Sequence, residues 1–302
     1  MAQIVARKDA SAMTAEPDSS VRSLLNEVAE QLTAAGIPHP QVDAELLLGH
    51  ILDASRGRVQ AMAVMGSSVT RAQASELRSL AARRAAREPL QHLTGRAPFR
   101  AMNLLVGPGV FVPRPETELL AQLAIDALVA AADPAPIAVD LGTGSGAIAL
   151  AMATEVPHAR VFAVERSPQA YAWAKRNLQE QRAANLQLVG GDLADAFGEL
   201  DGRVSVVASN PPYVPDDAIP RDPEVRLFDP EEALYGGEDG LDVVRVLSRR
   251  ARALLHPGGL LAIEHGELQG EAVRSILDAD GWHASATHRD LTLRDRVTTA
   301  LR

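Results

Sequence analysis

The chain has 302 residues, 46% of them hydrophobic, and a formal net charge of −9, so it can form a full catalytic core and a second, smaller domain. It has no cysteine, which excludes disulfides, thiolate metal sites and a cysteine nucleophile. The acidic excess lies beyond Leu90 and disfavours DNA as a partner, because Lys and Arg provide the affinity for phosphates.

Residues 1 to 18 are small and polar, which predicts a disordered tail. They lack the apolar core of a signal peptide or an anchor. The chain also has no run of about 18 apolar residues that would span a membrane. We therefore expect a cytoplasmic protein without membrane contact, and we expect it to be a monomer.

Residues 19 to 88 predict a small helical domain. Apolar residues repeat at helical spacing from Val21 to Leu32, and Thr70–Gln73 is typical of a capping box that opens a further helix. The apolar stripes are most simply the core of a helical bundle. The basic residues Arg83, Arg84 and Arg87 are typical of a solvated face, with contact to a partner as the alternative.

Residues 89 to 113 differ from the helical part. Phe99, Met102, Leu104 and Val106 alternate loosely, and Gly107-Pro108-Gly109 follows them. This pattern predicts a hairpin linker between the helical domain and the rest of the chain, residues 114 to 302.

The run Ile137–Leu141 predicts a buried strand that leads into a glycine-rich loop and then a helix. Glycines allow close approach of a ligand, and the helix start offers free N–H groups, so this loop is typical of a nucleotide-cofactor site. A nicotinamide site would need Gly at position 147, which is Ala, and no P-loop lysine follows. The loop residues are Gly142, Thr143, Gly144, Ser145 and Gly146.

Two further runs end in acidic residues. The run Arg160–Val164 ends in Glu165, whose carboxylate can accept both hydroxyls of an adenosine ribose. The run Leu186–Val189 leads to Asp192 and Leu193, which can accept the adenine amino group and cover the ring. Taken singly, Glu165 is also explained as a solvated acid and Asp192 as a turn residue.

The run Val204–Ala208 is followed by Asn210, Pro211, Pro212 and Tyr213. Prolines have no N–H group, so the strand cannot continue through them and carbonyl oxygens are left as acceptors beside the Asn210 side chain. Such a cluster suits a substrate with a planar NH2 group, either an amide or an aminopurine. The alternative is an ordinary Asn-Pro turn.

Helical runs follow each of these strands, and Leu260–Ile263 predicts a late strand. Strands that alternate with helices predict an α/β fold with a doubly wound, mostly parallel sheet. In such a sheet the carboxyl ends of the strands lie at one edge, so the predicted binding residues belong to one site.

The glycine loop, the strand-end acids and the Asn-Pro-Pro-Tyr turn together resemble a class I S-adenosylmethionine-dependent methyltransferase, which has a Rossmann-like fold. More segments, in the same order, resemble the release-factor glutamine methyltransferase family. Asp229 and Leu293 depart from the pattern, because Glu and Gly are usual there. The further segments are Glu88–Gly95, Phe111–Glu118, Ala233–Leu241, Glu264–Gly266 and Gln269–Gly270.

The resemblance implies N5-methylation of the glutamine in the Gly-Gly-Gln motif of peptide chain release factors, with S-adenosylmethionine as methyl donor. It also implies that the N-terminal helical domain helps to bind the protein substrate. The cofactor residues would be those of the glycine loop together with Glu165, Asp192, Leu193 and Asn210.

An amide nitrogen is a poor nucleophile because its lone pair is delocalised into the carbonyl group. We expect the Asn210 side-chain oxygen and the Pro211 carbonyl to accept its two N–H bonds and to turn the nitrogen toward the methyl group. Tyr213 would pack against the amide, and Pro212 would complete the substrate turn. The reaction needs no metal and no general base.

Three other functions share some of these sequence features. Adenine-N6 methylation of DNA uses the same four residues, but the chain shows no basic target-recognition insert. A non-catalytic S-adenosylmethionine-binding module would tolerate damage at the substrate turn, which is intact. A nicotinamide oxidoreductase is disfavoured by the glycine spacing.

Overall fold

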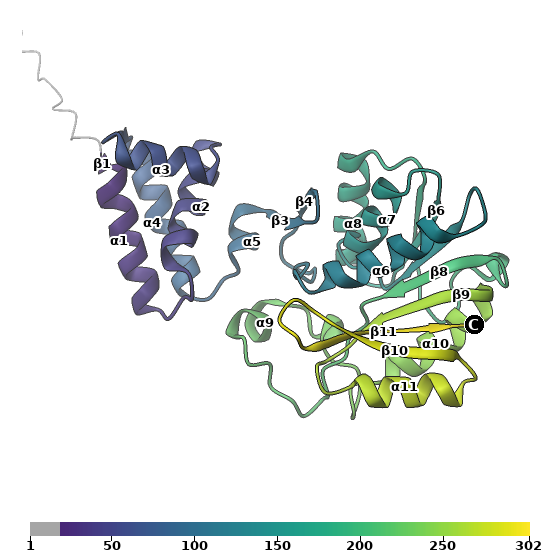
Figure 1. Cartoon of the computed structure of the whole chain (residues 1–302). Helices are drawn as coiled ribbons and strands as arrows, with labels where there is room; N and C mark the ends of the chain where they lie inside the picture. Colours follow the sequence, from purple (N-terminus) through teal and green to yellow (C-terminus); the bar gives the residue numbers. More distant parts are fainter. Residues whose placement is uncertain (1–18) are drawn as a thin grey trace, which may run out of the picture. The chain divides into compact units, whose positions relative to one another are not determined.

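A computed structural model describes residues 19–302 of the chain (Figure 1). The expected disordered tail lies outside the described residues. The described residues divide into two compact units, with the boundary between Leu93 and Thr94. Within residues 19–302 no helix is both long and apolar enough to cross a membrane.

The first unit is a helical bundle around its own hydrophobic core, to which Leu24, Leu47 and Leu77 contribute. The Thr70 side chain accepts a hydrogen bond from the Gln73 backbone, and the Gln73 side chain accepts one from the Thr70 backbone, which confirms the predicted capping box. The elements are β1 (Ser19–Ser20), α1 (Val21–Ala34), α2 (Pro40–Leu52), α3 (Arg56–Val64), β2 (Ser68–Val69) and α4 (Arg71–Ala85).

Arg83 at the end of α4 is exposed, as expected for a solvated face, but the prediction of a solvated face is wrong for Arg84. Arg84 is buried and donates to Asp43 at 2.7 Å. Arg83 forms a bidentate pair with Glu88. Two of these cations are therefore paired with carboxylates of their own domain.

The second unit contains a seven-stranded sheet with the order β10-β11-β9-β8-β5-β6-β7. Strands β5 to β9 run parallel, and β10 and β11 form an antiparallel edge. This confirms the predicted doubly wound, mostly parallel sheet. The strands are β5 (Ile137–Leu141), β6 (Arg160–Glu165), β7 (Leu186–Gly190), β8 (Val204–Ser209), β9 (Leu255–Glu264), β10 (His283–Arg289) and β11 (Asp295–Leu301).

Helices cover both faces of this sheet (Figure 1). Alternating residues of β5 divide between two cores: Ala138 packs with α6, α7 and α8, and Val139 packs with α10 and α11. A strand that is buried on both faces explains the continuous apolar runs in the sequence. The helices that contribute to these two cores are α6 (Thr117–Ala130), α7 (Ala147–Glu155), α8 (Pro168–Gln181), α10 (Asp242–Leu254) and α11 (Gly270–Ala279). The short helix α9 (Pro223–Phe228) belongs to the same unit, and α5 (Leu90–Thr94) includes the boundary between the units at Leu93.

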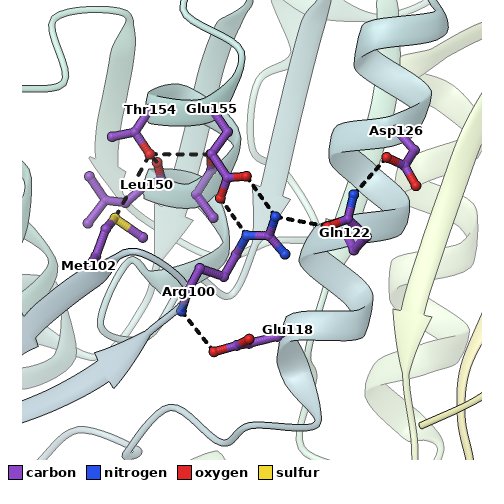
Figure 2. A network of polar contacts seen from close by, with 9 residues as sticks. Arg100, Met102, Glu118, Gln122, Asp126, Leu150, Thr154 and Glu155 are labelled. Carbon is purple, nitrogen blue, oxygen red and sulfur yellow. Dashed lines mark hydrogen bonds and ion pairs between the residues drawn. The ribbon is translucent and has the colours of Figure 1, made fainter. Parts of the chain in front are cut away.

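A short hairpin, β3 (Arg96–Phe99) and β4 (Met102–Leu105), precedes α6 in the chain. Figure 2 shows how Arg100 in its turn holds it to two helices. The Arg100 backbone donates to Glu118 of α6 at 2.8 Å, and its guanidinium donates to Gln122 of α6 at 2.9 Å and to Glu155 of α7 at 2.6 Å. The hairpin is therefore fixed to the sheet domain by polar contacts.

Candidate active site

A cavity of about 740 Å³ lies at the carboxyl ends of β5, β6, β7 and β8. Strand β5 pairs with β6 on one side and with β8 on the other, so this is the point where the order of strands reverses. Ligands of doubly wound folds bind in the crevice at such a point. The volume suits a drug-sized ligand. The predicted residues that line the cavity are Gly142, Thr143, Gly144, Ser145, Glu165, Asp192, Leu193, Asn210, Pro211, Pro212 and Tyr213.

Gly146 is the one predicted cofactor residue that is absent from the cavity lining. It is buried at the start of α7 with a φ of +87°, and a Cβ atom there would lie 3.3 Å from Leu150 and 3.7 Å from Ala174. Its place in the structure is explained by the backbone turn and by the close packing of α7 against α8.

Asp140, near the end of β5 and just before the glycine loop, holds this loop by hydrogen bonds. Its Oδ2 accepts hydrogen bonds from the Thr143 hydroxyl at 2.6 Å and from the Ala149 backbone at 3.1 Å. Burial raises the pKa of Asp140 to about 7, while these two hydrogen bonds oppose the shift. Asp140 was not among the predicted site residues, although an acid at the end of an apolar strand is a signal for such a role.

Glu165 holds two backbone segments beside the cavity. Its Oε2 accepts from the Gly144 N–H and its Oε1 from the Ser167 N–H, both at 2.8 Å. A carboxylate oxygen has a second lone pair, so each oxygen can still accept a hydroxyl group from a ligand. Asp192 is exposed at the next strand end, where its Oδ1 accepts from the Ala194 N–H at 2.9 Å.

The Asn-Pro-Pro-Tyr turn is held in shape by contacts with Leu234, Gly240 and Gln269. The Val214 N–H donates to Leu234 at 2.8 Å, and the Gln269 side chain donates to the Tyr213 carbonyl at 2.9 Å. Gly240 has a φ of +74°, and a Cβ atom there would lie 2.3 Å from the Tyr213 oxygen. Only glycine allows this approach, which explains why a glycine-rich segment accompanies the turn.

The Asn210 side chain lies beside two residues that the sequence analysis did not assign to the site. Its Nδ2 donates to Thr117 Oγ1 at 3.4 Å. Ser209 pairs with Ile263 in the sheet, so Glu264, the last residue of β9, lies beside Asn210. Glu264 is 1% exposed, and its Oε2 has no hydrogen-bond partner among the described residues. Both residues belong to segments that carried the family resemblance, and this was the available signal for them.

The segment before α6 forms one wall of the cavity. Arg114 lies over the Phe111 ring, 5.0 Å from its centre, and donates to Asp229 at 2.7 Å. Burial raises the pKa of Asp229 to about 6, although Arg114 opposes the shift. The Asp229 departure thus occurs at an ion pair with Arg114, which lines the cavity.

Comparison with known proteins relates the chain to methyltransferases. The PrmC N-terminal domain model matches residues 23–95, and the Methyltransferase small domain model matches residues 102–229. A release factor glutamine methyltransferase of Streptomyces coelicolor is 48% identical, and the alignment covers 92% of this chain and 97% of that protein. The corresponding protein of Bifidobacterium longum is 43% identical, with 93% and 99% covered.

A relative with a different name is also similar over most of its length. The 4-amino-L-phenylalanine/4-methylamino-L-phenylalanine methyltransferase of Streptomyces pristinaespiralis is 38% identical, with 92% of this chain and 94% of that protein covered. This relative is named for an amine of low molecular mass, whereas the first two relatives are named for a glutamine of a release factor.

Proposed function

The chain belongs to the release factor glutamine methyltransferase family, and we propose that it methylates the side-chain nitrogen (N5) of the glutamine in the Gly-Gly-Gln motif of a peptide chain release factor. Family membership agrees with the resemblance found in the sequence. The observation that carries the proposal is the shared cavity, in which the glycine loop and the Asn-Pro-Pro-Tyr turn face the same space.

We propose that S-adenosylmethionine binds in the part of the cavity formed by the glycine loop. Glu165 would accept the ribose hydroxyls, Asp192 the adenine amino group, and Leu193 would cover the ring. The free lone pairs of Glu165 support this assignment. When it is bound, S-adenosylmethionine supplies an electrophilic methyl group on a sulfonium centre.

The substrate turn would bind and orient the glutamine side chain. Asn210 Oδ1 and the Pro211 carbonyl would each accept one N–H of the amide, which directs the nitrogen lone pair to the methyl group and stabilises the positive charge that develops on nitrogen. Burial raises the pKa of the Tyr213 hydroxyl, so Tyr213 stays neutral and would wall off water. The proton leaves the nitrogen after transfer, and no residue is required to remove it beforehand.

A protein substrate agrees with the charge of the sheet domain, since an acidic surface does not favour DNA. We also propose that the protein acts in the cytoplasm and that it is a monomer. The relative from Streptomyces pristinaespiralis suggests one specific alternative substrate, 4-amino-L-phenylalanine, which also presents a planar NH2 group.

The test is to incubate the full chain with labelled S-adenosylmethionine and four acceptors in parallel. These are a release factor, the same factor with the Gly-Gly-Gln glutamine changed to alanine, duplex DNA, and 4-amino-L-phenylalanine. We expect label on the first acceptor alone. Label on the altered factor, on DNA or on the free amine would contradict the proposed substrate.

A further inference from the structure

We propose that Glu264 is a positioning residue: together with Thr117 it fixes the side-chain amide of Asn210 so that Oδ1 faces the substrate and Nδ2 faces away. This inference rests on the proposed function, because it concerns how the substrate amide is bound. It gives a role to the buried Glu264 carboxylate, which does not take part in the methyl transfer itself.

The three side chains come from separate elements. Asn210 follows β8, Thr117 is the first residue of α6, and Glu264 is the last residue of β9. Thr117 and Glu264 are both buried. The Asn210 amide donates to Thr117 at 3.4 Å. Ser209 pairs with Ile263 in the sheet, which brings Glu264 beside Asn210, and the Oε2 atom of Glu264 is buried without a hydrogen-bond partner among the described residues.

The direction of the hydrogen bonds follows from what each group can donate. The Thr117 hydroxyl accepts from Asn210, so its own proton is left for another acceptor. An ionised carboxylate only accepts, and the unpartnered oxygen of Glu264 is the acceptor that we assign to this proton. Asn210 therefore turns its NH2 group toward this pair. Its Oδ1 is left on the side of the cavity, as an acceptor for the substrate N–H.

Without this arrangement the amide could rotate by half a turn at little cost. The NH2 group would then face the substrate NH2 group, with two donors opposed and no acceptor between them. A side-chain amide has similar outlines in both orientations, so packing alone discriminates poorly between them. The carboxylate supplies the discrimination because only one orientation satisfies it.

The carboxylate is ionised only in the upper part of the physiological range. Burial raises the pKa of Glu264 to about 7, the hydrogen bond from Thr117 and the charge of Arg296 oppose the shift, and Glu116 adds to it. Tyr213 also faces Glu264, and the pKa of the neighbouring His265 is lowered by burial, so both stay neutral near pH 7. Protonation of Glu264 removes the requirement that both neighbours donate.

The experiment measures the single-turnover rate of methyl transfer to a release factor, at saturating substrates, between pH 6 and 9. The variants are Glu264→Gln, Thr117→Val and Thr117→Ser, with Glu155→Gln as a control. Glu155 is a carboxylate on α7 that pairs with Arg100 and does not line the cavity. Binding of S-adenosylmethionine is measured for each variant by calorimetry, which also establishes that the variant is folded.

For the wild type we expect a rate that rises with pH through about 7. In Glu264→Gln we expect the rate to fall by roughly ten- to a hundred-fold and to become independent of pH in this range. KM and the affinity for S-adenosylmethionine should change little. Thr117→Val should behave alike, Thr117→Ser should recover most of the rate, and Glu155→Gln should match the wild type.

A wild type that does not label the release factor overturns the proposed function and this inference with it. If the wild type is active, an unchanged rate and pH profile in folded Glu264→Gln overturns the positioning role alone. The same conclusion follows if Thr117→Val and Thr117→Ser are equally active. A merely structural role for Glu264 would lower stability without removing the dependence on pH.

Discussion

Asn210 is the residue on which the proposed reaction depends most directly. It lines the cavity, and its amide is oriented by buried neighbours. We predict that Asn210→Ala lowers the rate of methyl transfer by at least about a hundred-fold, because one of two acceptors for the substrate amide is lost. Affinity for S-adenosylmethionine, measured by calorimetry, should stay within a few fold. Turnover near the wild-type rate would exclude this role.

Asp140 predicts how stability depends on pH. Its pKa is raised from 3.8 to about 7, so the folded state holds a proton that the unfolded state releases near pH 4. The stabilising effect of this proton is present below pH 4 and is lost as pH rises to about 7.

Asp140→Asn removes this titration and keeps an acceptor for the Thr143 hydroxyl. Relative to the wild type, its free energy of unfolding should therefore increase by about 1.4 kcal/mol per pH unit across this window, as measured by urea denaturation. Asp217→Asn, at an exposed aspartate, is the control and should show no such trend. A constant difference for Asp140→Asn would mean that Asp140 keeps an ordinary pKa.

Single residues of the site differ in how far the sequence reveals them. Glu165, Asp192 and Asn210 each follow a recognisable strand, so their common edge could be predicted from the order of motifs. Thr117 and Glu264 could not be placed in this way, because they approach Asn210 only through the pairing of β8 with β9 and the packing of α6. Such contacts depend on the strand order, which local patterns do not specify.

At the scale of elements, the turn between β10 and β11 contains a strained residue. Leu293 has a φ of +64° and is 76% exposed, at the position where the family usually has Gly. Asp290 holds the turn by accepting from the backbone N–H groups of Thr292 and Arg294. A leucine in the left-handed region costs roughly 1 to 2 kcal/mol, and exposure leaves little apolar burial to offset the cost.

We predict that Leu293→Gly raises the free energy of unfolding by about 0.5 to 1 kcal/mol, because the strain is relieved. The control is Leu291→Gly in the same turn: Leu291 is fully exposed but has no positive φ. Its replacement should leave stability unchanged or lower it slightly. Equal effects of the two changes in urea denaturation would argue against strain at Leu293.

Element boundaries were predicted less well than element types. The late strand was expected over Leu260–Ile263, whereas β9 spans Leu255–Glu264. Its first half contains Pro257, Gly258 and Gly259, which are typical of a turn. The pairing of Val204 with Leu255 and the register shift that follows extend the strand there, and such an irregular pairing leaves no signal in the sequence.

At the scale of the whole molecule, each unit has a hydrophobic core of its own. Leu47 belongs to the core of the helical unit, and Leu120 to a core of the sheet unit. Both tryptophans, Trp173 and Trp282, lie in the sheet unit. Tryptophan fluorescence therefore follows the sheet unit, whereas circular dichroism follows the helices of both.

We predict that Leu47→Ala destabilises the helical unit by about 2 to 5 kcal/mol and shifts the urea transition seen by circular dichroism. The fluorescence transition and the affinity for S-adenosylmethionine should not change. Leu120→Ala is the matched change in the other unit and should shift the fluorescence transition. If Leu47→Ala shifts both signals equally, the units unfold as one.

The reversal of strand order at β5 makes the site a property of the assembled sheet. The cavity wall takes residues from Gly109 through Val246 along the chain, and Glu264 lies further still. No continuous fragment shorter than this stretch contains the groups needed to hold both reactants. If the chain is cut between Gly109 and Val246, the site can re-form only when the two fragments restore the pairing of β5 with β6 and β8. Recovery of activity from two fragments would therefore report that the sheet has reassembled.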